Sequence, residues 1–306
     1  MKYESKVINK ILKNSAKLEI DDSSRVVFMS DCHRGDGTYN DTLIHNKNIY
    51  KSSLRYYLKN DFTLIELGDG DELWKNKSMK DISYSYSDIF KILLEFNKDE
   101  RLYMVYGNHD MVKKDKNFIK KQEKILNRIS LGFGKEVVEL FSNINFYEGV
   151  VIKYLKNNKD IIAFHGHQVD FMNCTLNKFS RFLVRYVWKV LEGIAGFKEP
   201  VSPSNNYKKG GLIDQKLDDL SKRERVMIIC GHTHNDIFPE ASKSIYFNDG
   251  CIIFPTSETC IEIEEGKISL IKWSIEVSNK NVLCVKRTIT KGPEKIDDYL
   301  NFAKRL

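Results

Sequence analysis

Histidines and acidic residues gather in five short polar clusters of the chain. The clusters read DCHRGDG, GDGDELW, GNHD, HGHQVD and GHTH. They hold six of the seven histidines, namely His33, His109, His165, His167, His232 and His234. Imidazole, carboxylate and amide groups are the donors with which proteins bind divalent transition metals. The pattern therefore points to metal-assisted chemistry.

The donors in these clusters suit a pair of metal ions. Two divalent ions roughly 3.5 to 4 Å apart need a bridging carboxylate and several N or O donors from different strands. Asp31 and His33 are two residues apart at a strand end, so their side chains are expected to point the same way and bind one ion. Asp69, in a glycine-flanked turn, can bridge to a second ion. The donors that complete the two sites are Asn108, His165, His232 and His234.

Each cluster follows a short run of apolar residues, rich in β-branched and aromatic side chains, which predicts a buried strand. The predicted strands are Arg25–Ser30, Phe62–Leu67, Arg101–Tyr106, Asp160–Phe164 and Val226–Cys230. Helical apolar spacing is found in Thr42–Lys59, Ser85–Phe96, Asp115–Leu131 and Lys135–Phe141. This alternation favours βα units and a largely parallel sheet. All five clusters are then expected at the carboxyl edge of one sheet, where open α/β folds bind ligands.

Two parts of the chain depart from the alternation of strands and helices. Between Ser244 and Thr290 apolar and polar residues alternate, which predicts a strand meander. Residues 171–197 form a long amphipathic stretch that a proline-containing loop follows, so we expect 171–224 to be a helical insertion. We therefore predict one domain over residues 1–306. Its fold class is α/β, with two packed mixed β-sheets flanked by helices.

The motifs occur in the order D-x-H, GD-x-x-[DE], GNH[DE], H and GH-x-H, which resembles the calcineurin-like metallophosphoesterase superfamily. That family has an αββα sandwich fold, in agreement with the predicted elements. The resemblance implies that one metal is bound by Asp31, His33, Asp69 and His234. It implies that the other is bound by Asp69, Asn108, His165 and His232. Both sets lie between Asp31 and His234 and share one carboxylate.

The resemblance also implies the reaction. His109 falls where the family keeps a histidine that binds the scissile phosphate or protonates the leaving group, and Glu72 falls where an acidic residue orients it. The expected activity is metal-dependent hydrolysis of a phosphodiester, pyrophosphate or phosphomonoester by attack of a metal-bridging hydroxide. Mn²⁺ is the ion we predict for such mixed donors in the cytosol, while Fe and Zn fit the same ligands.

The cluster GDGDELW is similar to the GD-x-x-E-x-W of UDP-2,3-diacylglucosamine hydrolases, which cleave a nucleotide-sugar lipid. A phosphorylated small molecule or a lipid-linked substrate is therefore expected. The chain reads GNHD and HGH where that subfamily reads GNRD and HGD, so the substrate is left open. Residues 171–197 could be a buried helix, a lid over acyl chains or a membrane-surface contact.

Several further residues of the clusters have two interpretations. Arg34 and Asp36 could bind a phosphate or sugar hydroxyls, or they could pair with each other. His167 could support a metal ligand and approach the substrate, or it could cap a turn. Trp74 is expected in the core rather than as a platform for a nucleotide base, and Cys32 is expected to be a small core residue.

Composition narrows the class of protein. The 306 residues include 49 Lys+Arg and 42 Asp+Glu, a formal charge of +7, with 30% charged and 42% hydrophobic residues. This is typical of a globular domain. Six scattered cysteines without a C-x-x-C pair, and an N-terminus without an apolar signal region, predict a cytoplasmic protein, with peripheral membrane contact as the alternative. The diffuse basic surface disfavours a nucleic-acid partner. A nuclease, a cyclic-nucleotide phosphodiesterase or a membrane-surface binding module remain the alternative functions.

Overall fold

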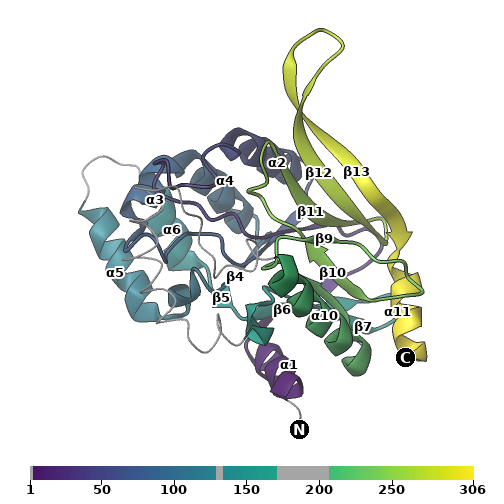
Figure 1. Cartoon of the computed structure of the whole chain (residues 1–306). Coiled ribbons are helices and arrows are strands. Elements are labelled where there is room, and N and C mark those ends of the chain that lie inside the picture. Colours follow the sequence, from purple (N-terminus) through teal and green to yellow (C-terminus); the bar gives the residue numbers. More distant parts are fainter. Residues whose placement is uncertain (1–2, 129–133, 171–206) are drawn as a thin grey trace.

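The computed structural model describes residues 3–128, 134–170 and 207–306, and two β-sheets form its centre (Figure 1). One sheet has seven strands in the order β13-β12-β11-β2-β3-β4-β5, and the other has six in the order β1-β6-β7-β8-β10-β9. The strands of the first are β2 Val26–Met29, β3 Thr63–Leu67, β4 Leu102–Val105, β5 Phe146–Tyr147, β11 Ser257–Glu264, β12 Lys267–Val277 and β13 Leu283–Lys295. Those of the second are β1 Ser15–Ile20, β6 Gly149–Tyr154, β7 Lys159–Phe164, β8 Met227–Cys230, β9 Asp236–Ile237 and β10 Tyr246–Asp249. Both sheets mix parallel and antiparallel pairs.

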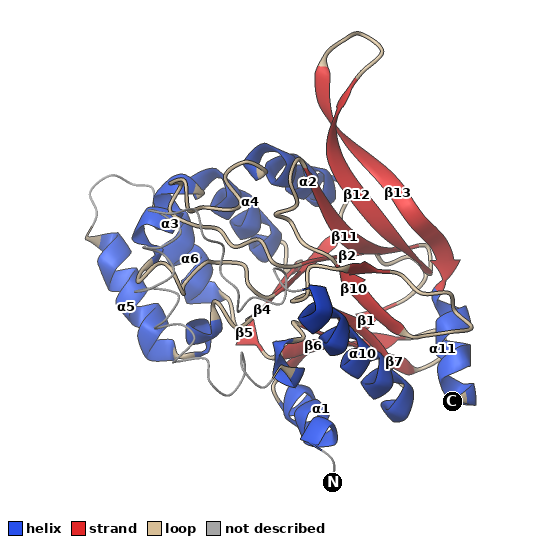
Figure 2. Cartoon of the chain, viewed as in Figure 1, coloured by secondary structure: helices blue, strands red, loops and turns tan. Residues whose placement is uncertain are grey.

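Helices cover the outer faces of the two sheets (Figure 2). On the seven-stranded sheet these are α2 Lys47–Lys59, α3 Met79–Ser85, α4 Ser87–Lys98, α5 Lys116–Asn127 and α6 Lys135–Asn143. On the six-stranded sheet they are α1 Tyr3–Lys13 and α10 Tyr207–Glu224, while α11 Ile296–Arg305 closes the core between the sheets. Two short 3₁₀ helices, Met111–Lys114 and His167–Val169, follow β4 and β7. The layers run helix, sheet, sheet, helix, and the predicted fold class is confirmed.

Strand β2 shows how an apolar run specifies this layering. Val26 and Phe28 point into the core between the two sheets, whereas Val27 and Met29 point into the core beneath the helices. All four are buried because successive side chains of a strand face opposite sides. An uninterrupted apolar run is what a strand covered on both faces requires.

The predicted strands and helices are present, but the predicted position of the clusters is wrong in one respect. Three clusters follow β2, β3 and β4 of the seven-stranded sheet, and two follow β7 and β8 of the six-stranded sheet. The clusters therefore meet at the rim between two sheets, not along the edge of one. An apolar run records that a strand is buried, and it does not record which strand lies beside it.

Other differences are local. The predicted helix Thr42–Lys59 begins only at Lys47. Nδ2 of Asn46 lies 2.6 to 2.8 Å from the carbonyl oxygens of Ile252, Phe254 and Ser257, so its two protons anchor the preceding turn. Within the expected meander, β10 pairs with β8 in the other sheet, so only β11–β13 form an antiparallel run. The expected insertion lies outside the described residues from 171 to 206, and α10 occupies its remainder. None of the helices in the described ranges is both long and apolar enough to span a membrane.

A buried acidic residue on β11 lies away from the clusters. Glu258 is fully buried, and neither of its carboxyl oxygens has a hydrogen-bond partner among the described residues. The nearby Ser53 hydroxyl donates instead to the carbonyl oxygen of Tyr50. Burial raises the pKa of Glu258 to about 8, so the folded protein keeps this side chain protonated at neutral pH.

This residue should make stability depend on pH. In the unfolded chain Glu258 ionises near its ordinary pKa of 4.5, so between about pH 5 and 8 the folded state holds one more proton than the unfolded state. The free energy of unfolding should therefore fall as the pH rises across this window. Glu258→Gln should remove this pH dependence. The free energy of unfolding of the variant, measured with urea, should therefore rise relative to that of the wild type between pH 5 and pH 8.

The matched control is Glu262→Gln on the same strand. Glu262 accepts hydrogen bonds from Tyr57 and Arg287, so its neutralisation should destabilise the protein at pH 7 rather than stabilise it. A Glu258→Gln variant with the same pH dependence as the wild type would contradict the assignment of a buried, protonated carboxyl.

Candidate metal centre

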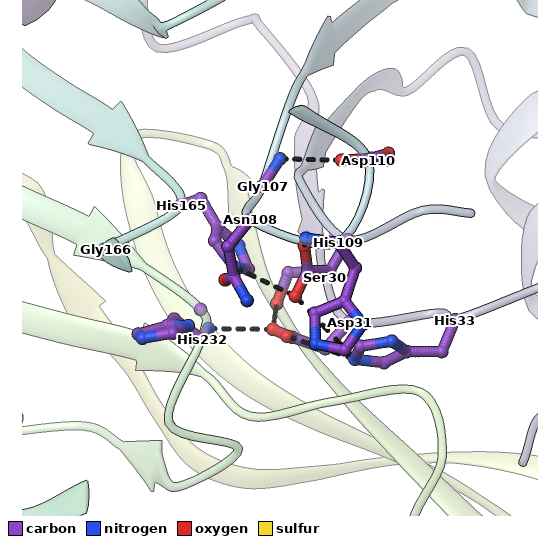
Figure 3. A network of polar contacts seen from close by, with 12 residues as sticks. Ser30, Asp31, His33, Gly107, Asn108, His109, Asp110, His165, Gly166 and His232 are labelled. Atoms are coloured by element: carbon purple, nitrogen blue, oxygen red, sulfur yellow. Dashed lines mark hydrogen bonds and ion pairs between the residues drawn. The ribbon is translucent and has the colours of Figure 1, made fainter. Parts of the chain in front are cut away.

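Asp31 joins the loops that follow β2 and β8. Its Oδ2 accepts from the backbone N–H of His232 at 2.8 Å and from the Ser30 hydroxyl at 2.5 Å (Figure 3). Its Oδ1 lies 3.0 Å from Nε2 of His234. Because β2 and β8 belong to different sheets, one carboxylate connects both halves of the rim.

Ser30 extends this connection to a second strand of the six-stranded sheet. Its hydroxyl lies 2.5 Å from Asp31 Oδ2 and 2.7 Å from Oδ1 of Asp249, at the end of β10. A hydroxyl has one proton, so both contacts are hydrogen bonds only if one carboxyl is itself protonated. Burial and the neighbouring Asp31 raise the pKa of Asp249 well above its usual range, so Asp249 is the carboxyl that more readily carries that proton. Neither residue belongs to a motif, although Ser30 directly precedes the first one.

The predicted ligands converge into two groups. Asp31, His33 and His234 form one, and Asp69, His165 and His232 form the other; within each group the ligand atoms lie within 4.8 Å of one another. By the same measure, His33 and Asp69 also form a group with His109. Oδ2 of Asp69 lies 3.3 Å from Nε2 of His165 and 3.8 Å from Nε2 of His33. Asp69 therefore lies between the two groups. Asn108 contacts the second group, with its Oδ1 3.2 Å from His165 Nε2.

The backbone at these positions is unusual. Asp31, His33, Asp69, His232 and His234 all have left-handed φ values, between 48° and 72°. Such values are uncommon and strained for residues other than glycine. The prediction that Asp31 and His33 lie at an extended strand end is therefore wrong. Both residues are in a tight loop beyond β2. Their side chains still converge, with His33 Nε2 3.7 Å from Asp31 Oδ1.

The charges of the buried side chains in the candidate centre favour the binding of cations. Burial alone would raise the pKa values of Asp31 and Asp69, but the neighbouring histidines hold both below the usual range, Asp31 far below it. Burial lowers the pKa values of His165 and His234, yet the carboxylates outweigh it and raise each to about 9. The two carboxylates thus remain ionised in a buried site, where an ion needs a compensating charge. Divalent cations supply such a charge.

The individual donors also fit metal binding. His165 Nδ1 lies 2.8 Å from the carbonyl oxygen of Leu67, an arrangement that leaves the Nε2 lone pair facing Asp69 once the ring is neutral. Burial lowers the pKa of His232, which keeps that ring neutral. Its Nε2 is buried, has no hydrogen-bond partner in the described part of the chain, and lies 3.6 Å from Oδ2 of Asp170. Two carboxylates, four imidazoles and one amide form a donor set suited to first-row divalent ions.

His109 lies beside the metal ligands and is held on three sides. Its backbone N–H donates to Oδ1 of Asp69 at 2.8 Å, and its ring Nδ1 lies 3.0 Å from both carboxylate oxygens of Glu72. The ring also stacks on Trp74, with centroids 4.0 Å apart and an interplanar angle of 17°. Trp74 is buried as predicted, and its indole N–H donates to the carbonyl oxygen of Asn108. The stacking on His109 could not be expected from the sequence.

The predicted contact of Arg34 with substrate needs correction. The side chain is fully buried, and its guanidinium forms two hydrogen bonds with Glu66 and one with Asp71. Lys113, also buried, pairs with Asp71 and Asp110. Arg34 therefore belongs to an ion-pair network that supports the loop after β3. The alternative interpretation, a pair between Arg34 and Asp36, is also wrong.

The remaining predicted residues are placed as follows. Asp36 is partly exposed and accepts from the backbone N–H and hydroxyl of Thr38, so it caps its own loop. His167 is buried, with its ring centroid 5.4 Å from that of His165. A contact of either residue with substrate stays a prediction. Cys32 is part of the core beneath the helices, as expected.

Comparison with known proteins identifies the family. The family model for calcineurin-like phosphoesterase matches residues 24–236, more than half of the chain and every predicted ligand. The chain belongs to the calcineurin-like phosphoesterase family. A search of curated proteins finds no match. Among solved structures, the crystal structure of Chaetomium thermophilum Vps29 is similar, with a TM-score of 0.38, 11% sequence identity, and coverage of 88% of this chain and 96% of that one.

The family and the clusters together support metal-dependent phosphoesterase chemistry. The protein should bind two Mn²⁺ per chain in calorimetric titration, because Asp69 stands between two donor groups. Asp69→Asn removes a charge that both groups share and should weaken both sites, with at most one equivalent retained after dialysis. Elemental analysis of the reconstituted protein provides the count. A wild-type protein that holds only one equivalent would contradict a dinuclear centre.

Proposed function

We propose that the protein hydrolyses a phosphoric ester or anhydride with the aid of two divalent ions, Mn²⁺ in the first instance. The observation that carries the proposal is the position of Asp69. One of its oxygens lies near histidines of both groups, and the other accepts from the backbone of His109. A shared carboxylate beside a non-ligand histidine suits displacement at phosphorus, where two cations lie close to one reacting centre.

Bound divalent ions supply two things in such a centre, namely polarisation of the phosphoryl oxygens and a lower pKa of water. The chain supplies the rest. Burial opposes protonation of His109, but the charges of Glu72 and Asp69 raise its pKa above the usual value. Glu72 accepts from Nδ1, so Nε2–H is the proton that can be donated. His109 can therefore bind a phosphoryl oxygen or protonate the leaving group.

Glu72 and Trp74 orient this histidine in the proposed reaction. Glu72 contacts His109 and lies 3.3 Å from Nδ1 of His33, so one carboxylate positions both the donor histidine and a metal ligand. Trp74 fixes the plane of the His109 ring, and its π-face favours the protonated form. Each contact limits the rotation of a side chain that must meet the substrate in one orientation.

The substrate remains a proposal at the level of chemical class. The GDGDELW motif favours a pyrophosphate or phosphodiester with a nucleotide or lipid portion. A cyclic nucleotide or a single-stranded nucleic acid is the alternative. A turnover screen of the Mn²⁺ protein against an aryl phosphomonoester, an aryl phosphodiester, cyclic nucleotides, a single-stranded oligonucleotide and nucleotide-diphospho lipids distinguishes these classes. Absence of turnover on all of them, with both metals bound, would overturn the proposal.

His109→Ala should keep both metals and lose turnover by about 10²- to 10⁴-fold, the usual effect of removing a positioned acid–base group. Steady-state kinetics on the best substrate of the screen, paired with elemental analysis, provide the measurement. The control is His45→Ala, because His45 is exposed and lies outside the five clusters. Loss of a metal in His109→Ala would make His109 a ligand, and unchanged turnover would exclude its catalytic role.

A further inference from the structure

The loop Gly231–Asn235 carries one ligand of each metal group. His234 belongs with Asp31, whereas His232 belongs with Asp69. Both histidines have left-handed φ values, 72° at His232 and 59° at His234. A loop with two strained positions holds its shape only when its surroundings determine it. The contacts of the residues beside these histidines therefore matter for the metal centre.

Those contacts lead to Asp214 on α10. Thr233, which lies between the two histidines, donates from Oγ1 to Oδ1 of Asp214 at 2.8 Å. Asn235, directly after His234, donates from Nδ2 to Oδ2 of Asp214 at 2.8 Å. Tyr246 of β10 adds a third bond to Oδ1, also 2.8 Å long. Asp214 is 8% exposed, so these bonds are screened from water.

Asn248 completes the contacts around this loop. Its Nδ2 donates to the carbonyl oxygen of Gly231 at 2.8 Å and lies 3.0 Å from Thr233 Oγ1 and 3.1 Å from Tyr246 Oη. The amide has two protons for these three acceptors, while the hydroxyls of Thr233 and Tyr246 each donate their own proton to Asp214. The bonds from Thr233, Asn235 and Tyr246 thus end on the Asp214 carboxylate, and Asn248 ties Gly231 to the same group.

We propose that Asp214 is a positioning residue for both metal sites. It touches neither a reacting atom nor a ligand side chain, and it acts through the residues that neighbour His232 and His234. A carboxylate that binds the loop on both sides of His234 fixes the directions of the two imidazoles together. This inference rests on the proposed two-metal centre. Loss of the Asp214 carboxylate should weaken the binding of both ions.

The test compares two carboxylates on the same helix. Asp214→Asn replaces an acceptor oxygen by an amide group that meets the Asn235 donor, so the loop loses its anchor while the side chain keeps its size. Asp218→Asn, one turn further along α10, alters a carboxylate that accepts from Ser244 and Lys222 and does not touch the loop. Calorimetric titration with Mn²⁺ alone should show affinity 10- to 100-fold weaker in Asp214→Asn and unchanged in Asp218→Asn.

A second measurement reports geometry rather than stability. The visible absorption of the Co²⁺-loaded protein depends on ligand geometry, and it should change in Asp214→Asn and match the wild type in Asp218→Asn. If Asp214→Asn does not fold, Thr233→Val removes the same anchor from the loop side and should weaken Mn²⁺ binding. Thr233→Ser restores the hydroxyl and should restore the affinity.

The outcomes separate this inference from the proposed function. A wild-type chain that binds no Mn²⁺ would overturn both. Normal Mn²⁺ binding by the wild type together with unchanged affinity and spectrum in folded Asp214→Asn would overturn the role of Asp214 alone. Equal weakening in Asp214→Asn and Asp218→Asn would also overturn it, because the effect would then come from the stability of α10.

Discussion

The carboxylate of Asp31 is the contact on which the candidate metal centre depends. It follows a strand of one sheet and binds the backbone and a side chain of the loop that follows a strand of the other. Ser30 and Asp249 add a second connection between the same sheets. The apolar core between the sheets holds them together, but it does not fix their offset to within a fraction of an ångström. Directional hydrogen bonds to one carboxylate at the rim can do so.

Charge balance explains the composition of the surroundings. Asp31 and Asp69 are ionised and buried, so their charges must be compensated within the site. On the side of the candidate centre, protonated His165 and His234 or bound cations can provide this charge. On the other side, Arg34 and Lys113 compensate the acidic residues beneath the loops. The centre is thus a buried group of carboxylates with cationic partners above and below, and this arrangement holds the ligand loops rigid.

Much of this arrangement could be predicted from the sequence. The apolar runs locate the strands, and the order of the motifs brings together Asp31, Asp69, His165 and the other predicted ligands. The partners of Arg34 could not be predicted, because Glu66 and Asp71 lie 32 and 37 residues away and nothing in the motif names them. Asp214 carries no motif signal either. Its role depends on how a helix packs against a loop, and periodicity does not report that packing.

The left-handed backbone of five predicted metal ligands has a consequence for how this fold changes over evolutionary time. Each strained position costs about 1 to 3 kcal/mol. The free energy of unfolding of a folded protein is only about 5 to 15 kcal/mol. Glycine at such a position relieves the strain and abolishes a ligand in the same step. At His232, whose backbone N–H and not its side chain holds Asp31, such a change would remove a predicted ligand and relieve strain without breaking the contact between the sheets. A chain with such a change should keep its fold after it has lost the proposed activity.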